Sequence, residues 1–391
     1  MLHVPILRAG APYESLNKNV VRDIRTGEPL AEVSVANRGL IALDLSVAAE
    51  QRRRLAALDT IALVEICRHA ATLFMEAELP LGDAVQSPDD YVAQTSASSG
   101  LPRVLCRANM AKIATVLTSM AQVLDGLTRG LDLTVLDDGA GPSPSGRNLS
   151  YLCQAQALGC VLPSNSPGVH SLWLPALALK VPVVLKPGGE EPWTPFRIAQ
   201  AFIKAGCPAQ AFAFYPTDHS GAAEILLKCG RSLLFGGGAT VDPWRIEPGV
   251  QIHGPGCSKI LFGADTASQW SNYLDLMEHS IADNGGRSCI NASGVWTPAN
   301  GRELAGELAR RLARIEARSL TDEGARLAAF SNPDVARGID ALIASQLEIP
   351  GAEDLTARYR KGPRLCEQHG CFFLLPTVVW CEDASHPLAD T

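Results

Sequence analysis

The chain has 391 residues, of which 47% are hydrophobic and 19% charged, and a formal net charge of −7. This length predicts two or three domains with ample core, and an acidic chain is an unexpected partner for nucleic acid. The most apolar region, 160–185, is broken by four prolines, so we expect no membrane span. Eleven cysteines without a paired framework favour a reducing cytoplasm. Cys366 and Cys371, with His369 between them, lack a second ligand pair, so no metal site is predicted.

The amino-terminal part of the chain predicts an extended arm followed by two helices. Residues 1–48 read as short strands joined by turns. Apolar residues recur at helical spacing over 48–79, and Pro80 ends that pattern. Asn109 is a candidate N-cap for a second amphipathic helix that reaches Leu127.

A long β-hairpin is predicted over 132–159. Its strands would be 133–136 and 149–157, on either side of a turn region rich in Gly, Pro, Ser and Asp. A protruding hairpin is often a pairing surface, so we expect a homodimer or tetramer through these residues. A plain connecting ribbon fits the same sequence equally well.

From residue 160 onward, strand-like and helix-like segments alternate. The expected strands are 160–162, 181–185, 211–215, 232–235 and 250–253, and the expected helices are 169–179, 194–205 and 220–229. Thr194-Pro195 is the expected start of the second of these helices, with Thr194 as N-cap. Such alternation predicts an α/β fold with a doubly wound, Rossmann-type parallel sheet. We therefore assign 1–131 and 160–257 to a dinucleotide-binding domain.

The residues from 258 to 391 predict a second α/β domain. The expected elements are strands at 260–262 and 293–296, helices at 266–281, 302–319 and 325–347, and a strand pair at 371–381. Pro333 interrupts the last helical stretch, and Pro376 separates the two strands of the pair.

One cysteine stands on a turn of small and polar residues at 284–293. Gly285 and Gly286, just before Cys289, allow positive φ and close approach to a ligand. A thiolate near backbone N–H groups is a strong nucleophile, so Cys289 is a candidate for covalent catalysis. The alternative is a packed, inert thiol in a turn before a strand.

Three further candidates each follow an expected strand. The glycine run 236–238 is a possible phosphate-binding turn, although a plain turn fits equally well. Lys186 stands where ligands bind in open parallel sheets, or else is a strand-end lysine whose ammonium reaches water. Asn165 could donate its amide to a developing oxyanion, or form a turn before Pro167.

Taken in chain order, these motifs resemble the aldehyde dehydrogenase superfamily. The resemblance rests on Leu162-Pro163-Ser164-Asn165-Ser166-Pro167, Val183-Val184-Leu185-Lys186-Pro187, Phe235-Gly236-Gly237 and Asn284-Gly285-Gly286-Arg287-Ser288-Cys289. Segments 235–241 and 253–258 are similar to the acyl-CoA reductase branch of that superfamily.

The resemblance implies an NAD(P)-dependent oxidoreductase acting on a small-molecule aldehyde or acyl thioester. Cys289 would attack the carbonyl to form a thiohemiacetal, and Asn165 with the Cys289 N–H would stabilise the oxyanion. Hydride transfer to NAD or NADP would leave an acyl thioester. The resemblance also implies a cofactor site formed by Lys186, Pro163, Ser164, Gly237 and Gly238.

The chain departs from the family pattern at three places. Segment 251–256 lacks the glutamate that activates water, and His253 is a weak substitute; this favours coenzyme A as the acyl acceptor. Gly189 replaces a frequent ribose-binding glutamate, with Glu190 or Glu191 as the nearest carboxylates, so NADP stays open beside NAD. The chain ends where a Glu-x-Phe-Gly-Pro segment is expected, so we interpret 258–391 as a C-terminally incomplete catalytic domain.

Three alternatives to a water-using aldehyde dehydrogenase follow. One is a CoA-acylating aldehyde dehydrogenase or acyl-CoA reductase. Another is a catalytically inactive NAD(P)-binding relative, suggested by the missing glutamates and carboxyl-terminal segment. A cysteine hydrolase is the weakest, because no His/Asn partner set for Cys289 is evident in the sequence.

Overall fold

The computed structural model describes residues 1–142 and 146–389, and the chain divides into two compact units. Unit 1 comprises 1–23, 28–95 and 107–254, and unit 2 comprises 24–27, 96–106 and 255–391. The predicted hairpin region belongs to unit 1. Two short segments from the first third of the chain thus belong to unit 2. The domain boundary predicted from the sequence, after residue 257, did not include them in the second domain.

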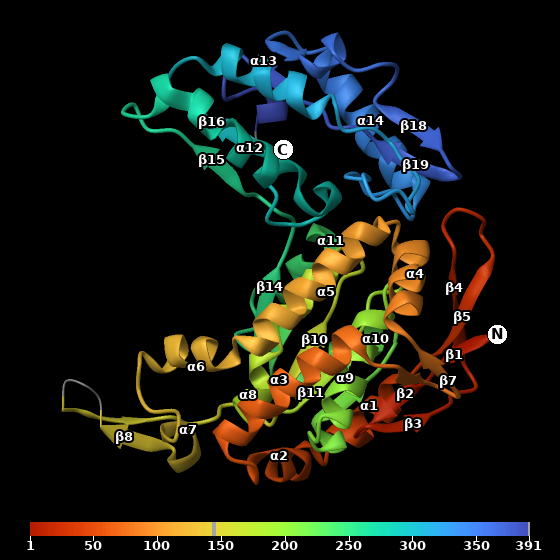
Figure 1. Ribbon diagram of the computed structural model, residues 1–391, viewed down its shortest axis with the longest axis vertical. Coiled ribbons are helices and arrows are strands. Elements are labelled where there is room, and N and C mark those ends of the chain that lie inside the picture. Colours follow the sequence, from red (N-terminus) through yellow and green to blue (C-terminus); the bar gives the residue numbers. More distant parts are fainter. Residues whose placement is uncertain (143–145, 390–391) are drawn as a thin grey trace. The chain divides into compact units, whose positions relative to one another are not determined.

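The core of unit 1 is a seven-stranded sheet with the order β14-β13-β10-β11-β12-β2-β3. Figure 1 labels β14, β10, β11, β2 and β3 of this sheet. The first five strands run parallel, and β2 and β3 extend the sheet in the antiparallel sense. The predicted α/β fold with a parallel sheet is therefore confirmed. The strands of unit 1 are β1 (Leu2–Val4), β2 (Ile6–Arg8), β3 (Ala11–Tyr13), β4 (Lys18–Arg22), β5 (Pro29–Ser34), β6 (Leu79–Leu81), β7 (Ala84–Gln86), β8 (Ala140–Pro142), β9 (Asn148–Ser150), β10 (Ala157–Val161), β11 (Val183–Lys186), β12 (Phe212–Phe214), β13 (Gly230–Phe235) and β14 (Val250–His253).

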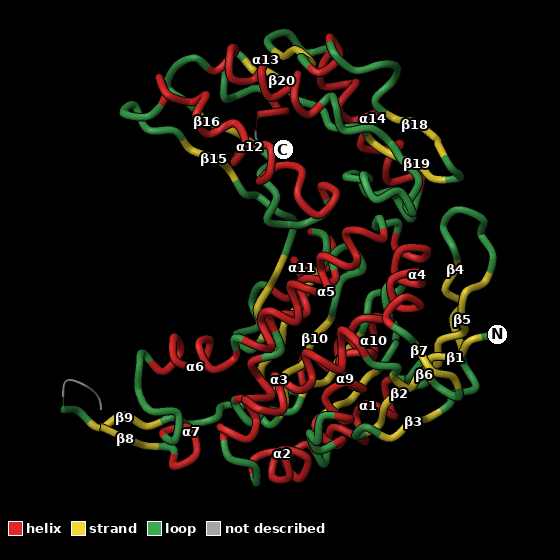
Figure 2. The backbone as a smooth tube through the Cα atoms, viewed as in Figure 1, coloured by secondary structure: helices red, strands yellow, loops and turns green. Residues whose placement is uncertain are grey.

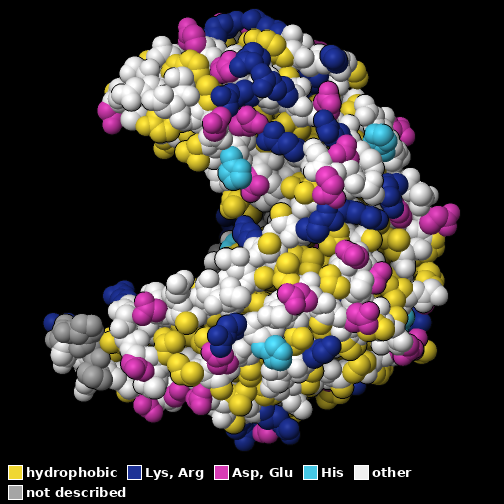
Figure 3. Space-filling view, viewed as in Figure 1, with side chains coloured by type: hydrophobic (Ala, Val, Ile, Leu, Met, Phe, Trp, Pro, Cys, Tyr) yellow, Lys and Arg dark blue, Asp and Glu magenta, His cyan; other side chains and the backbone are white. Residues whose placement is uncertain are grey.

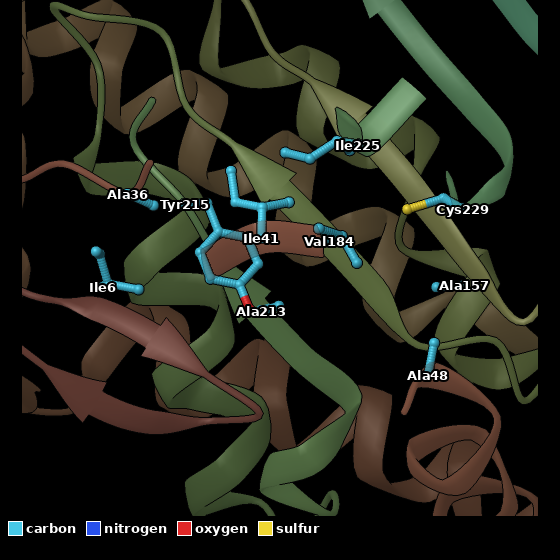
Figure 4. Close-up of a cluster of buried hydrophobic side chains, with 10 residues drawn as sticks. All are labelled: Ile6, Ala36, Ile41, Ala48, Ala157, Val184, Ala213, Tyr215, Ile225 and Cys229. Carbon is cyan, nitrogen blue, oxygen red and sulfur yellow. The ribbon is translucent and has the colours of Figure 1, made fainter. Parts of the chain in front are cut away.

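Successive side chains of β12 point to opposite faces of the sheet, and both faces are packed. On one face Ala213 joins a buried cluster with Ile41 of α1 and Ile225 of α10 (Figure 4). On the other, Phe214 makes an edge-to-face contact with Phe196 of α9. The helices are α1 (Arg38–Leu45), α2 (Ala48–Ala56), α3 (Thr60–Glu76), α4 (Pro88–Ser99), α5 (Arg103–Thr118), α6 (Met120–Thr128), α7 (Val135–Asp138), η1 (Pro167–Leu172), α8 (Pro175–Ala178), α9 (Trp193–Lys204), η2 (Ala209–Ala211), α10 (His219–Lys228), α11 (Gly238–Val241) and η3 (Asp242–Trp244); α4 and α5 belong partly to unit 2.

Three expected helix features of unit 1 are wrong. Asn109 lies inside α5, and its side-chain oxygen accepts a hydrogen bond from Gly168 N instead of capping a helix. Thr194 is the second residue of α9, and its hydroxyl donates to the Glu191 carboxylate. The helix expected over 169–179 consists of two short pieces, η1 and α8, each of which has proline at its start.

The hairpin is shorter than predicted. Strands β8 and β9 pair antiparallel and lie side by side in Figure 2, and residues 143–145 of the expected turn lie outside the described residues. The strand expected at 133–136 is a helical turn, α7, preceded by Asp132, whose carboxylate accepts from Thr134 N at 2.9 Å. The strand expected at 149–157 is wrong in extent, because β10 of the main sheet begins inside it.

Over its described residues, unit 2 holds its strands in pairs. Strands β15 and β16 pair parallel, whereas β17–β20 and β18–β19 pair antiparallel. The strands expected within 371–381 therefore form, but they pair with other segments and not with each other. The helix expected over 302–319 ends at Leu312, and 325–332 is not helical. The elements are β15 (Lys259–Leu261), η4 (Ala267–Tyr273), α12 (Leu274–Ala282), η5 (Asp283–Gly286), β16 (Gly294–Trp296), α13 (Gly301–Leu312), α14 (Pro333–Leu347), β17 (Ala352–Asp354), η6 (Thr356–Arg358), β18 (Leu365–Gln368), β19 (Cys371–Leu374), β20 (Val379–Cys381) and η7 (Pro387–Ala389).

None of the described helices combines the length and apolarity needed to cross a membrane. Within 1–142 and 146–389, no group of three or more His, Cys, Asp or Glu side chains is arranged to hold a metal ion. Basic and acidic side chains are interspersed on the face drawn in Figure 3.

Candidate functional site

The carboxyl ends of β10, β11 and β13 bring together the predicted cofactor residues of unit 1. Val161 of β10 pairs with Lys186 of β11 on one side and with Leu234 of β13 on the other. The chain adds β11 and β12 on one side of β10, then β13 and β14 on the other, so the order reverses between β10 and β13. In open α/β sheets, ligands bind outside the strand ends at such a switch point.

Two loops flank this switch point. The loop after β10 carries Pro163, Ser164 and Asn165, which are all half-buried. The loop after β13 carries Gly237, which precedes the short helix α11, and Gly238, its first residue. A Cβ added at Gly237 would meet no atom within 4 Å, so the backbone there borders open space. Backbone N–H groups in such a position can hold an anion.

Lys186 ends β11, which neighbours β10 on the side opposite β13, and is half-buried. Burial is the main effect on its ammonium and lowers the pKa, whereas the Glu190 carboxylate acts in the opposite direction. Among the described residues, the ammonium has no hydrogen-bond or ion-pair partner. A partly desolvated cation without a protein partner is well suited to a ligand hydroxyl or phosphate.

The loops after β10 and β11 are packed directly against each other. A Cβ added at Gly188 would lie 2.2 Å from Ser164 Oγ and 2.7 Å from Ser164 N, so only glycine fits there. Glu190 N also donates to Ser164 Oγ at 3.2 Å. The loop that carries Asn165 is thereby held to the loop that follows Lys186.

His253, the weak substitute for the missing glutamate, ends β14. Its ring stacks on Phe235 with centroids 4.4 Å apart, and its buried Nε2 has no hydrogen-bond partner among the described residues. Burial lowers the pKa of this imidazole, so the ring is neutral at pH 7 and able to accept a proton. No carboxylate occurs in 250–256.

Cys289 lies in unit 2, in the turn that follows α12 and η5. Its side chain is exposed, as expected for an accessible thiol. Asn284, Gly285 and Gly286 have φ values of 52°, 70° and 74°, so three consecutive residues in the left-handed region turn the chain. A Cβ at Gly285 would lie 2.8 Å from Ala328 N, so glycine is required there for space as well as for conformation.

Hydrogen bonds and close packing fix the Cys289 turn. The Asn291 side chain accepts from Ser288 N at 2.7 Å and donates to Ser280 O at 3.2 Å. Gly256 packs against the Cys289 carbonyl, because a Cβ there would lie 2.1 Å from that oxygen. Within the described part of the chain, the Cys289 N–H has no acceptor, which leaves it free to donate to an oxyanion.

Unit 2 also contains an apolar cavity of about 980 Å³. Leu308 of α13, Ile339 of α14 and Trp380 of β20 are among the side chains that line it. Residues on both sides of the Cys289 turn contribute to the lining, whereas Cys289 itself does not. This cavity was not predictable from the sequence, because its walls come from segments that are far apart in the chain.

The role of Glu191 was likewise not predicted from the sequence. As one of the carboxylates nearest Gly189, Glu191 was a candidate to replace the missing ribose ligand, yet its side chain is only 1% exposed. It accepts hydrogen bonds from Thr194 N and Thr194 Oγ at 2.8 and 2.7 Å and lies 3.3 Å from His170 Nε2. The available signal was its spacing, three residues before Thr194 at the start of a helix, which is typical of a side-chain cap.

Comparisons with known proteins agree with this fold. The model of the "Aldehyde dehydrogenase family" matches residues 14–234, which include Asn165 and Lys186 and end before Cys289. No curated protein matches the chain.

Solved structures with the same fold cover nearly the whole chain. An indole-3-acetaldehyde dehydrogenase in complex with NAD+ is 18% identical, with a TM-score of 0.79 over 100% of this chain and 77% of that one. An aldehyde dehydrogenase from Brucella melitensis biovar abortus 2308 is 17% identical, with a TM-score of 0.77 over 99% and 77%. A succinate-semialdehyde dehydrogenase from Burkholderia pseudomallei is 18% identical, with a TM-score of 0.76 over 99% and 78%.

Proposed function

The chain belongs to the aldehyde dehydrogenase family of oxidoreductases, and we propose that it oxidises an aldehyde with NAD or NADP by covalent catalysis at Cys289. The observation that carries the proposal is the exposed Cys289 thiol on a turn fixed by hydrogen bonds and left-handed residues. A nucleophile must be both accessible and held in place, and this turn provides both conditions.

The carboxyl edge of the unit 1 sheet fits a dinucleotide. The glycine loop after β13 presents backbone beside open space, as a pyrophosphate requires. The Lys186 ammonium at the end of β11, which has no partner among the described residues, suits a ribose hydroxyl. Gly189 places no carboxylate against a ribose 2′-phosphate, so the site suits NAD and NADP alike. The residues that would hold the cofactor are Lys186, Pro163, Ser164, Gly237 and Gly238.

In the proposed reaction the Cys289 thiolate adds to the aldehyde carbonyl carbon. A C–S bond forms, and the carbonyl π electrons move to the oxygen to give a thiohemiacetal. The Cys289 N–H donates a hydrogen bond to this oxyanion, and the resemblance to the family assigns the role of second donor to the Asn165 amide. When bound, the nicotinamide ring supplies an acceptor for the hydride of the former aldehyde carbon. With that hydride gone, the C=O bond re-forms and Cys289 carries an acyl thioester.

Release of the acyl group requires water or a thiol. Water needs a general base, and His253 is the neutral group nearest the position where the family places one. Its Nε2 is buried and its ring is stacked, which limits its access to a water molecule. A thiol such as coenzyme A attacks a thioester without that base, and this favours CoA-acylating activity as the second candidate.

The test compares Cys289→Ala with Cys257→Ala, which removes the other exposed cysteine of unit 2. Aldehyde-dependent reduction of NAD(P), followed by absorbance, should fall at least ~10³-fold in Cys289→Ala and stay at the wild-type rate in Cys257→Ala. Acceleration by added coenzyme A would identify the CoA-acylating reaction.

Mass spectrometry of intact protein provides a second readout of the same proposal. Wild-type protein incubated with aldehyde and cofactor should carry one acyl adduct, and Cys289→Ala should carry none. Unchanged turnover in Cys289→Ala would rule out the nucleophile assignment. Cofactor binding without turnover over a panel of aldehydes would favour a non-catalytic NAD(P)-binding protein.

A further inference from the structure

A buried chain of polar side chains crosses unit 1 beside the proposed cofactor loops. Trp173 Nε1 lies 3.1 Å from His170 Nδ1, and His170 Nε2 lies 3.3 Å from a Glu191 oxygen. The other Glu191 oxygen accepts from Thr194 N and Oγ, and Thr194 Oγ lies 2.7 Å from Tyr91 OH. All five side chains are at most 1% exposed.

The chemistry of these groups determines where each proton lies. An indole N–H only donates, so His170 Nδ1 must accept from Trp173 and the imidazole proton must be on Nε2. His170 Nε2–H therefore donates to Glu191. Since the Thr194 hydroxyl donates to Glu191, Tyr91 OH is the donor to Thr194 Oγ. Each hydrogen bond among these five side chains is therefore donated in the direction of the Glu191 carboxylate.

The His170–Glu191 contact joins the segment that follows β10 to the loop that follows β11. Glu191 lies in the loop that follows Lys186, and His170 lies in η1, which begins two residues after Asn165. Gly168 N, on the same η1 helix, is held by Asn109 Oδ1 at 2.9 Å. The loop after Lys186 and the η1 helix that follows Asn165 are thus joined by a buried contact.

Stability alone is a poor explanation for this arrangement. A buried carboxylate loses its hydration, and apolar side chains of similar volume are often equally or more stabilising in such places. A carboxylate adds a directional constraint, because hydrogen-bond donors must approach its two oxygens. The Glu191 carboxylate therefore sets the distance between its own loop and His170. Such a contact is suited to alignment of a catalytic group.

We propose that Glu191 and His170 are positioning residues that align the Asn165 amide with the loop after Lys186, so that the oxyanion donor is placed correctly when the cofactor occupies its site. The inference rests on the proposed function for the roles of Asn165 and Lys186. It adds two residues that touch neither substrate nor cofactor and act through the loop between β10 and η1.

Glu191→Gln tests the alignment with almost no change in volume. The amide oxygen can still accept from Thr194, which leaves the NH₂ group facing His170 Nε2–H, donor against donor. The imidazole cannot move its proton to Nδ1, because Trp173 N–H occupies that side. We expect kcat to fall about 10- to 100-fold, as for a small misplacement of a catalytic group, with the dissociation constant of NAD(P) close to wild type.

A second substitution should rescue the first. In Glu191→Gln/Trp173→Phe, the Nδ1 side of His170 is freed, so the imidazole can carry its proton there and accept from Gln at 191 through Nε2. The double variant should recover a large part of the lost kcat, whereas Trp173→Phe alone should not raise kcat above the wild-type value. Glu224→Gln is the matched control: Glu224 is also buried and ion-paired, with Arg38, but contacts neither loop.

Nuclear magnetic resonance separates this proposal from the proposed function. Nitrogen shifts of His170 should show the Nε2–H tautomer in wild type and the Nδ1–H tautomer in the double variant. The side-chain amide signal of Asn165, assigned with Asn165→Ala, should move in Glu191→Gln, return in the double variant and stay in place in Glu224→Gln. An unmoved Asn165 signal in Glu191→Gln overturns the inference, whether or not any aldehyde is turned over. Absence of turnover with these signals behaving as expected would instead count against the proposed function alone.

Discussion

Unit 1 and unit 2 support their candidate residues in different ways. Unit 1 places its loops at the edge of a seven-stranded sheet packed on both faces, with Trp173, Trp193 and Phe196 at most 1% exposed. Unit 2, over its described residues, has strands only in pairs and an apolar cavity of about 980 Å³. The proposed cofactor loops therefore depend on a continuous core, whereas the Cys289 turn depends on local hydrogen bonds and glycine conformations.

The largest expected effect concerns a cation inside unit 1. Arg197 is 1% exposed and donates to the carbonyl oxygens of Phe74, Ala77 and Gln86 at 3.0, 2.7 and 2.9 Å. Arg197→Met keeps most of the volume but leaves three carbonyls without this donor. The free energy of unfolding should fall by about 3–5 kcal/mol, measured by urea denaturation.

The control for that substitution is an arginine of unit 2. Arg311 forms ion pairs near the surface with Asp275 and Glu278, where water can replace the lost partner. Arg311→Met should lower the free energy of unfolding much less than Arg197→Met does. Equal losses in the two variants would show that buried polar contacts do not distinguish the two units.

Hydrogen exchange should reveal the same contrast without any substitution. Amides of β10, β11 and β13 lie in the interior of the large sheet, whereas those of β15, β16 and β19 lie in two-stranded pairs. We expect at least ~10²-fold slower exchange in the first group, because opening it disrupts the whole core. Exchange followed by mass spectrometry at peptide resolution would test this. Similar rates in both groups would contradict the comparison.

The smallest expected effect concerns cofactor binding by Lys186 at the edge of the unit 1 sheet. Lys186→Met should weaken NAD(P) binding about 10-fold, the loss expected for one hydrogen bond to a charged group, as measured by titration calorimetry. Lys204→Met, at the exposed end of α9, is the control and should leave the affinity unchanged.

The same variant has a prediction for stability. Burial lowers the folded-state pKa of Lys186 below its unfolded value, so the ammonium is less favourable in the folded state than in the unfolded state and its burial opposes folding. Removal of the charge should therefore raise the melting temperature of the ligand-free protein slightly. A lower melting temperature would indicate a protein partner for the ammonium.

Several features were predictable because their causes are local. Alternating apolar segments with turn residues between them indicated the parallel sheet, the strand that ends at Lys186 and the loops that carry Asn165 and Gly237. Two glycines before Cys289 indicated a tight turn, and the structure has both in the left-handed region. Strands that run parallel necessarily bring the loops at their carboxyl ends to one edge of the sheet.

Other features were missed because their causes lie far apart in the sequence. Asparagine is common at helix N-caps, yet the side chain of Asn109 bonds to Gly168, which is 59 positions away. The strands within 371–381 were taken as a pair, yet each finds a different partner. No local pattern distinguishes these outcomes, since a polar side chain or strand edge bonds to whatever group the fold places beside it.

By itself, the amino-acid sequence determined the α/β class, the family and the position of the candidate nucleophile, because periodicity, glycine placement and motif order are properties of neighbouring residues. Only the tertiary structure decided that Glu191 is a buried acceptor facing His170 and not a ribose ligand, and that unit 2 contains an apolar cavity. The physical reason is burial: whether a carboxylate meets water or an imidazole depends on segments that approach each other only after the chain has folded.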